Sequence, residues 1–143
     1  MEKRISSRAI IIKDNKVLMM YRRKKDKEGN IDEYYVTPGG GQENNETLEE
    51  TVIRELKEEF NVDIKIIGYL GIIENDKTIN YFYHCEVING TPTLSGEEKE
   101  RMTDDNYYEV SEVSLDELDN KIIIGREMIE LALNKKYQDR ISE

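Results

Sequence analysis

The segment 40–62 concentrates side chains that can bind a metal ion. Four glutamates and one arginine stand out there: Glu46, Arg54, Glu55, Glu58 and Glu59. Carboxylates gathered in one place repel one another unless a cation lies between them. Mg²⁺ prefers oxygen ligands, and once bound it polarises phosphates and activates water. These residues therefore predict a metal site that serves a phosphate-bearing substrate.

Helix geometry gathers these side chains on one face. A helix turns by about 100° per residue, so the arginine and the glutamates within 54–59 share an arc of about 140°. The opposite arc is apolar and carries Val52, Ile53, Leu56 and Phe60. One face can therefore be buried while the other collects carboxylates. The alternative is an acidic helix with a merely solvated face, but this does not explain Glu46 or the glycines before the helix.

The flanking residues predict where this helix begins and ends. Thr47 and Glu50 form a T-x-x-E capping box. Asn61 tolerates the left-handed backbone of a C-terminal cap. We therefore expect a helix at 48–60. The preceding segment 38–41, PGGG, can approach a ligand closely and can offer a backbone carbonyl oxygen to a metal.

The spacing of these residues resembles the Nudix box of the Nudix (MutT-like) hydrolases, G-x5-E-x7-R-E-U-x-E-E-x-G-U, where U is bulky and aliphatic. The matching residues are Gly40, Glu46, Arg54, Glu55, Leu56, Glu58, Glu59 and Val62. Asn61 replaces the last glycine, which is a mild change because Asn is the next-best residue for such a cap. The resemblance covers about 5–118. It implies the Nudix fold, a mixed sheet flanked by helices, which is an α+β domain of the α/β/α sandwich type.

The resemblance also implies a reaction, the hydrolysis of a phosphoanhydride bond with Mg²⁺ or Mn²⁺ as cofactor. In such an enzyme Glu55, Glu58 and Glu59 bind the metal. The carbonyl oxygen of Gly39 is the further ligand that the resemblance implies. The implied substrate is a nucleoside diphosphate linked to another group, as in a nucleoside triphosphate, a dinucleoside polyphosphate or a nucleotide sugar.

Other residues would support this reaction. Arg54 would hold neighbouring carboxylates by bidentate hydrogen bonds, and Glu46 would brace the junction of loop and helix. The general base in this family is either a box glutamate or an acidic residue of a downstream loop, where the candidates are Glu97, Glu98 and Glu100. Glu98-x-x-Arg101 fits a pattern frequent in the family, so Glu98 is the expected base. A solvated run of charge explains each of these glutamates equally well.

Four residues are candidates for contact with the substrate. Arg22 and Arg23 end a predicted strand and can reach phosphates. Tyr35 stands where the family often has tryptophan, and Tyr81 can stack on a base. Packing on a half-buried strand is the favoured alternative for the tyrosines. A sensor that binds a nucleotide derivative without turnover is the alternative function, but such members usually lose box glutamates, which are present here.

Composition limits the partners and the compartment. The chain has 143 residues and a net charge of −10, which disfavours contact with nucleic acid polymers. Cys85 is the only cysteine, so we expect a small buried apolar residue in a cytoplasmic protein. No stretch approaches the roughly 20 apolar residues of a membrane span. The expected partner is a small nucleotide-type molecule, and a homodimer is left open.

The rest of the chain predicts a single domain, 1–143, in which short strands surround the box helix. Apolar runs between turn signals predict strands at 7–12, 17–22, 34–37, 64–74, 78–88 and 107–113. A turn at 13–16 should join the first two strands in a hairpin. A capping box at 114–117 predicts a short helix at 115–118, and a closing helix is expected at 122–137.

Overall fold

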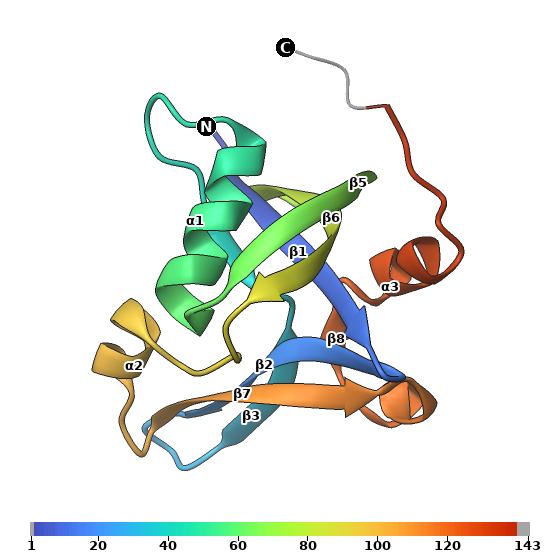
Figure 1. Cartoon of the computed structure of the whole chain (residues 1–143). Coiled ribbons are helices and arrows are strands. Elements are labelled where there is room, and N and C mark those ends of the chain that lie inside the picture. The colour runs from blue at the N-terminus through green and yellow to red at the C-terminus, as the bar shows by residue number, and fades with distance from the viewer. Residues whose placement is uncertain (1, 140–143) are drawn as a thin grey trace.

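The computed structural model describes residues 2–139, apart from the side chains of residues 97 and 98. Eight strands within this range form one curled, mixed sheet with helices beside it (Figure 1). The strands are β1 (Arg4–Lys13), β2 (Lys16–Lys25), β3 (Ile31–Val36), β4 (Gly39–Gly41), β5 (Asp63–Glu74), β6 (Thr78–Asn89), β7 (Asn106–Ser114) and β8 (Ile123–Ile124). The helices are α1 (Leu48–Phe60), α2 (Gly96–Arg101), the 3₁₀ helix η1 (Leu115–Asn120) and α3 (Arg126–Leu133).

Strand β1 connects the two halves of the sheet. Residues 4–11 of β1 pair in parallel with β6, and residues 6–8 pair with the short β4. The chain then turns into β2 through Asp14 and Asn15, both in the left-handed region with φ of 52° and 64°. The hairpin predicted at 13–16 is thus confirmed. β2 lies between β3 and β7, and this half lies below β1, β5 and β6 in Figure 1.

The apolar side chains of β1 and β2 alternate between the two faces of the sheet and so divide the core into two clusters. Ala9 and Ile11 belong to one cluster, whereas Ile10 between them belongs to the other. Leu18 and Met19 are divided in the same way. Because successive side chains of a strand point to opposite faces, each face needs its own cover. Helix α1 covers the first cluster and α3 covers the second (Figure 1). The predicted α/β/α sandwich is confirmed.

Helix α1 spans Leu48–Phe60 as predicted. The Thr47 hydroxyl accepts a hydrogen bond from the Glu50 backbone N–H at 3.0 Å, and the Glu50 carboxylate accepts one from the Thr47 N–H at 2.9 Å. This is the expected capping box. Asn61 ends the helix with φ of 57°, so the left-handed cap that the family forms with glycine is formed here with asparagine.

The closing helix is shorter than predicted. Helix α3 covers Arg126–Leu133 and not 122–137. The preceding strand Ile123–Ile124 pairs in parallel with Tyr35 and Val36 of β3, and extended residues cannot belong to a helix. The prediction was wrong because a short apolar run fits a strand and a helix equally well. The short elements β4 and α2 were not predicted.

Candidate active site and metal centre

Three glutamates of α1 bring their carboxylates together. One carboxylate oxygen from each of Glu55, Glu58 and Glu59 lies within 4.8 Å of the others. Glu59 is buried, Glu55 is half-buried and Glu58 is exposed. Helical residues three and four apart share a face, so the E-x-x-E-E spacing accounts for this cluster. The structure therefore brings together the three residues that the sequence nominates as metal ligands.

Arg54 ties the helix to the loop before it. Its Nε and Nη2 donate to both carboxylate oxygens of Glu46, at 2.6 and 3.0 Å. Its Nη1 donates to Glu55 and Glu58 at 3.1 and 3.0 Å. Its Nη2 also reaches the carbonyl oxygen of Gly41 at 2.9 Å. One guanidinium thus orients two of the clustered glutamates and holds the loop against α1.

Glu46 is the main anchor of that guanidinium. Besides Arg54, it accepts hydrogen bonds from the Glu43 backbone N–H at 3.1 Å and from the Thr51 hydroxyl at 2.7 Å. The hydrogen bonds from Arg54 above all lower the pKa of Glu46 from 4.5 to about 2. This carboxylate therefore stays charged well into the acid range. Its contacts join loop to helix and leave it outside the carboxylate cluster.

Glu55 lies directly against the glycine loop. A Cβ atom on Gly40 would lie 2.6 Å from Glu55 Oε1, so only glycine leaves room for this carboxylate. Burial raises the pKa of Glu55, the Arg54 and Arg8 cations act against that rise, and Glu58 adds to it. A carboxylate in such a partly dry place is stabilised in its charged form by a nearby cation.

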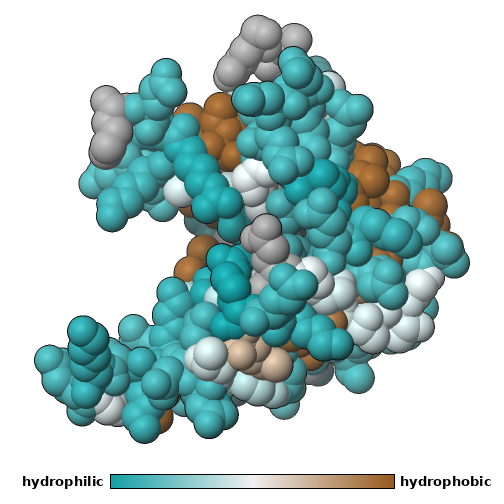
Figure 2. Space-filling model, turned by 90° about the vertical axis from the view of Figure 1, so that its left-hand side faces the viewer, coloured by the Kyte–Doolittle hydropathy of each residue, from teal (hydrophilic) through white to brown (hydrophobic). Residues whose placement is uncertain are grey.

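A cleft of about 350 Å³ opens beside the carboxylate cluster. Glu55, Glu59 and the loop 38–40 line part of it. Four arginines also line it, and they are Arg4, Arg8, Arg22 and Arg101. Figure 2 shows the molecule hollowed between two lobes, with hydrophilic residues around most of the hollow. The cleft can therefore hold a charged ligand against both carboxylates and guanidiniums.

The donor set at this site suits a hard divalent cation. Within the described residues the cluster consists of carboxylates alone, the ligand type that Mg²⁺ and Mn²⁺ prefer. Gly39, the predicted source of a carbonyl ligand, lines the same cleft as Glu55 and Glu59. Gly40 leaves the Glu55 carboxylate its space. The residues present thus fit Mg²⁺ or Mn²⁺.

The predicted substrate-binding residues do not all reach the cleft. Arg22 lines it. Arg23, the next residue of β2, points to the opposite face of the strand and lies over the Tyr107 ring, 4.7 Å from its centroid. Tyr35 packs against the second core cluster. Tyr81 is 8% exposed and belongs to the first core cluster, which agrees with the packing alternative for the tyrosines.

Strand register identifies aromatic residues that the sequence alone missed. Arg22 lies opposite Tyr34 of β3 and opposite Tyr108 of β7. Its guanidinium carbon is 5.8 and 4.6 Å from the centroids of these two rings. Of the adjacent tyrosines, Tyr34 and not Tyr35 therefore shares the face of Arg22. These two tyrosines are recognised from the pairing of β2 with β3 and β7. That pairing cannot be read from a single sequence.

The segment after β6 is anchored on the C-terminal end of α1. The Ser95 backbone N–H donates to the carbonyl oxygen of Glu59 at 2.8 Å, and the Ser95 hydroxyl donates to that of Glu58 at 2.5 Å. Helix α2 starts from this anchor and ends at Arg101, which lines the cleft. The side chain of Glu98, the expected general base, lies outside the described residues, and its role stays a prediction.

Cys85 and His84 lie outside the cleft lining. Cys85 is 1% exposed, and burial raises the pKa of its thiol to about 12. Its prediction as a small buried apolar residue is confirmed. His84 Nδ1 lies 2.8 Å from the Tyr137 hydroxyl, a contact between β6 and the segment after α3.

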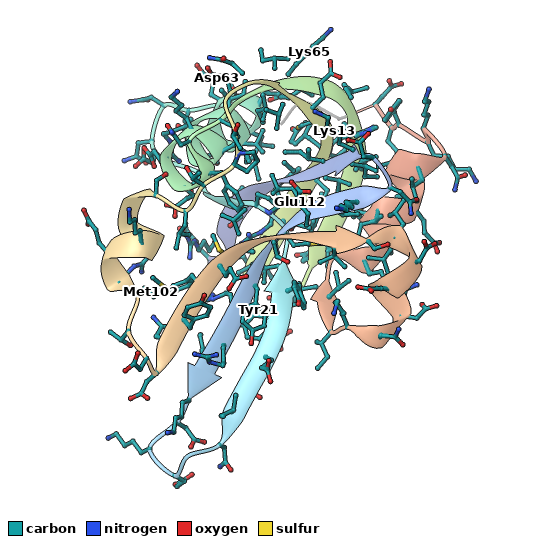
Figure 3. All side chains as sticks on the ribbon, turned by 60° about the horizontal axis from the view of Figure 1, so that its bottom comes forward. Lys13, Tyr21, Asp63, Lys65, Met102 and Glu112 are labelled. Atoms are coloured by element: carbon teal, nitrogen blue, oxygen red, sulfur yellow. The ribbon has the colours of Figure 1, made fainter. Side chains whose placement is uncertain are left out.

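A second hollow, of about 450 Å³, lies toward the other end of β2. Leu18, Lys13, Lys16 and Glu112 are among the residues that line it. Figure 3 shows Lys13 and Glu112 near one another on this side of the molecule. Glu112 lies opposite Leu18 in the pairing of β7 with β2, and it lines this hollow together with the two lysines.

Comparison with known families identifies the class of protein. Residues 3–131 match the family model of the NUDIX domain, and the chain therefore belongs to the NUDIX domain family. The matched segment includes α1, the loop before it and every described residue that lines the cleft.

Solved structures show the same fold at low sequence identity. The MutT NUDIX hydrolase from Burkholderia pseudomallei superimposes with a TM-score of 0.69 and 20% identity, over 91% of this chain and 98% of that one. A NUDIX hydrolase from Nitrosomonas europaea gives 0.70 and 17%, over 95% and 92%. An ADP-ribose pyrophosphatase from Streptococcus suis gives 0.63 and 18%, over 99% and 97%.

A curated relative is more similar in sequence but longer. The ADP-ribose pyrophosphatase of Methanocaldococcus jannaschii is 33% identical in an alignment over 97 residues, which covers 64% of this chain and 55% of that protein. The match thus spans little more than half of the relative. Within the described residues, none of the helices has the length and apolar character needed to cross a bilayer. The cytoplasmic location and the homodimer stay predictions.

Proposed function

We propose that the protein is a Mg²⁺-dependent pyrophosphohydrolase that cleaves the phosphoanhydride bond of a nucleoside diphosphate linked to another group. The observation that carries this proposal is the carboxylate cluster of Glu55, Glu58 and Glu59 beside a cleft lined by arginines. Positive charge near several oxygens of a pyrophosphate group stabilises it during cleavage, and the arginines together with a metal ion held by the carboxylates would supply that charge. Membership of the NUDIX domain family and relatives named pyrophosphatases support the same reaction class.

The metal would be held by Glu55, Glu58 and Glu59, with the carbonyl oxygen of Gly39 as a further ligand. Bound there, Mg²⁺ or Mn²⁺ supplies charge neutralisation of the phosphates and acidifies water. Arg54 keeps the Glu55 and Glu58 carboxylates in place from outside the cleft, through hydrogen bonds of 3.1 and 3.0 Å. It therefore acts through these ligands and is a positioning residue.

The hydrolysis balances without any further reactant. A water oxygen forms a new bond to one phosphorus, and the bond from that phosphorus to the bridging oxygen breaks. The bridging oxygen leaves on the other phosphate with the electron pair. A carboxylate accepts the proton of the attacking water, and we assign this role to Glu98, with a box glutamate as the alternative.

Arg22 is the substrate-binding residue that the geometry supports best among those predicted. It lines the cleft, and its Nη2 donates to the Tyr108 hydroxyl at 2.9 Å. This bond and the rings of Tyr34 and Tyr108 orient its guanidinium, whose terminal N–H groups can bind phosphate. Arg23, Tyr35 and Tyr81 line no part of this cleft among the described residues.

A substrate panel tests the proposal. The protein is assayed with Mg²⁺, with Mn²⁺ and with EDTA against nucleoside triphosphates, oxidised nucleotides, ADP-ribose, dinucleoside polyphosphates and nucleotide sugars. We expect metal-dependent release of phosphate-containing products from at least one class. Saturable nucleotide binding without product release would instead identify a sensor of the same fold. If the protein neither bound nor cleaved any of these compounds, nucleotides would be excluded as its substrates.

A further inference from the structure

The hydroxyl group of Tyr108 lies at the centre of a small polar cluster in the cleft. Tyr108 of β7 lies directly opposite Arg22 of β2, and both residues line the cleft. Its hydroxyl oxygen accepts a hydrogen bond from Arg22 Nη2 at 2.9 Å and another from Asn106 Nδ2 at 3.1 Å. Asn106 is two residues before Tyr108 on the same strand, so the two side chains share a face. One phenol oxygen thus connects an arginine and an amide at the cleft.

These two contacts determine where the hydroxyl hydrogen points. A tyrosine hydroxyl can donate one hydrogen bond and accept two, whereas a guanidinium can only donate. With N–H groups of Arg22 and Asn106 both directed at the oxygen, the hydroxyl hydrogen of Tyr108 points away from both. Among the described residues none accepts this hydrogen, since Tyr108 makes only these two side-chain hydrogen bonds. The Tyr108 hydroxyl therefore keeps one donor that the described part of the protein does not use.

Two other tyrosines of these strands differ in this respect. Tyr107, the neighbour on the opposite face of β7, donates to Glu109 at 2.6 Å, and Tyr21 donates to Glu33 at 2.5 Å. Tyr108 has no such carboxylate acceptor among the described residues, although it is only 5% exposed. Buried donors are normally paired, because an unpaired donor loses its bond to water and gains none in return. A ligand in the cleft would therefore supply the acceptor for Tyr108.

The surroundings of this hydroxyl indicate the kind of acceptor. The Arg22 guanidinium carbon lies 4.6 Å from the centroid of the Tyr108 ring, so the acceptor would lie beside a cation. A positive charge so close favours an anionic atom. A hydroxyl that itself accepts hydrogen bonds is also polarised into a stronger donor. A non-bridging phosphate oxygen fits both features, because it is anionic and accepts charge-assisted hydrogen bonds.

We propose that Tyr108 binds the substrate directly, by donating its hydroxyl hydrogen to a non-bridging oxygen of the phosphoanhydride group. Arg22 would bind the same group from beside it. Asn106, which is not among the described residues that line the cleft, would act through Tyr108 and is a positioning residue. The inference rests on the proposed function and adds a substrate contact to it. No covalent bond changes at Tyr108, so its role is to bind and orient the phosphates.

Binding of a diphosphate that cannot be cleaved gives the first test. Methylenediphosphonate carries the phosphate oxygens without a nucleoside, and a CH₂ group replaces its bridging oxygen. Its Kd is measured with Mg²⁺ by phosphorus NMR titration, which also detects weak binding. Tyr108→Phe keeps the ring and should raise this Kd by at least about 5-fold, because a hydrogen bond to a charged group is lost. A smaller change, or no binding to the wild type, would overturn the inference.

A double-mutant cycle separates direct contact from the positioning of Arg22. If Tyr108 acted only through Arg22, removal of its hydroxyl would have no further effect once the guanidinium is gone. In the Arg22→Met background we expect Tyr108→Phe to raise the Kd again, by at least about 3-fold. No further increase would show that Tyr108 only positions Arg22, and it would overturn the direct contact. Asn106→Ala should cost less affinity than Tyr108→Phe, and an equal cost would contradict donation from Tyr108 to the phosphate.

Tyr107→Phe is the matched control. It removes the hydroxyl of the adjacent tyrosine, which is not among the residues that line the cleft, and should leave the Kd unchanged within about 2-fold. Thermal unfolding checks that each variant is folded. A loss of affinity equal to that of Tyr108→Phe would refute the assignment to Tyr108.

The substrate panel distinguishes this inference from the proposed function. Metal-dependent cleavage by the wild type, together with an unchanged Kd in Tyr108→Phe, would refute the Tyr108 contact and leave the hydrolase function intact. Absence of cleavage for every substrate would refute the proposed function and, with it, this inference.

Discussion

The Glu55 carboxylate lies directly against the backbone of Gly40, in the space where any other residue would place its Cβ atom. Gly41 gives the same space to the guanidinium of Arg4. Consecutive glycines thus admit one anionic and one cationic group to the edge of the same cleft. A Cβ atom at either position would make these charged groups shift, so the two glycines set where the carboxylate and the guanidinium lie.

Gly40→Ala should therefore impair the metal site while the fold persists. The added methyl group would displace the Glu55 carboxylate, and loss of a group that positions a metal ligand typically costs about 10- to 100-fold in affinity or activity. We expect losses of that size in Mn²⁺ affinity by calorimetry and in kcat/KM. Thermal unfolding and circular dichroism serve as the control for folding. Unchanged Mn²⁺ affinity in a folded variant would show that Glu55 is not a ligand.

Glu59→Gln should lower kcat by at least about 100-fold. The substitution keeps the size of the side chain but removes the charge of the buried member of the cluster. Glu130→Gln, on the exposed surface of α3, is the matched control and should retain activity. Near-normal turnover by the Glu59 variant would contradict its assignment as a metal ligand.

The ion pair of Glu46 with Arg54 should contribute to stability in a pH-dependent way. The pKa of Glu46 is about 2 in the folded protein against an ordinary 4.5. A carboxyl with a lowered pKa adds to the free energy of unfolding above its ordinary value, and this contribution is lost as the pH falls toward the folded value. The contribution should thus be complete above about pH 4.5, decline as the pH falls, and be lost below about pH 2.

Glu46→Gln isolates this contribution. Hydrogen bonds to charged groups are worth about 1.5–3 kcal/mol, so we expect a loss of that order in the free energy of unfolding at pH 6. The difference from the wild type should shrink as the pH falls from about 4.5 toward 2. Denaturant titrations at pH 6, 4.5 and 3 measure it, with Glu130→Gln as the control. A difference that stays constant with pH would show that the charge of Glu46 is not involved.

The sequence predicted those parts of the fold that local signals determine. The capping box at Thr47 and the cap at Asn61 fixed both ends of α1, because each is a short-range hydrogen-bond pattern. The apolar run at 122–124 carried no such signal. Its place as β8 depends on pairing with Tyr35 of β3, a contact distant in sequence. Periodicity alone therefore started the predicted closing helix too early, and it also carried that helix past Leu133, where α3 ends.

The same distinction applies to the candidate site. Glu55, Glu58 and Glu59 cluster through helix geometry, so their spacing is enough to predict them. The four arginines that line the cleft come from β1, β2 and α2, and only the tertiary fold brings them together there. The choice between Tyr34 and Tyr35 depends on strand register, since a shift of one residue moves a side chain to the other face.

The contact of Tyr137 with His84 predicts a local contribution to stability away from the cleft. The Tyr137 hydroxyl lies 2.8 Å from His84 Nδ1, and its ring packs over Gly68, where a Cβ atom would lie 2.6 Å from the Tyr137 Cγ atom. Tyr137→Phe keeps the ring and removes only the hydrogen bond. It should lower the free energy of unfolding by about 0.5–1.5 kcal/mol and leave kcat/KM unchanged. Tyr107→Phe, which removes a hydrogen bond to Glu109 only two residues away on the same strand, is the control and should have a smaller effect because it connects no distant segments. A change in kcat/KM without a change in stability would mean that this contact is coupled to the cleft and not to the packing of β5 and β6.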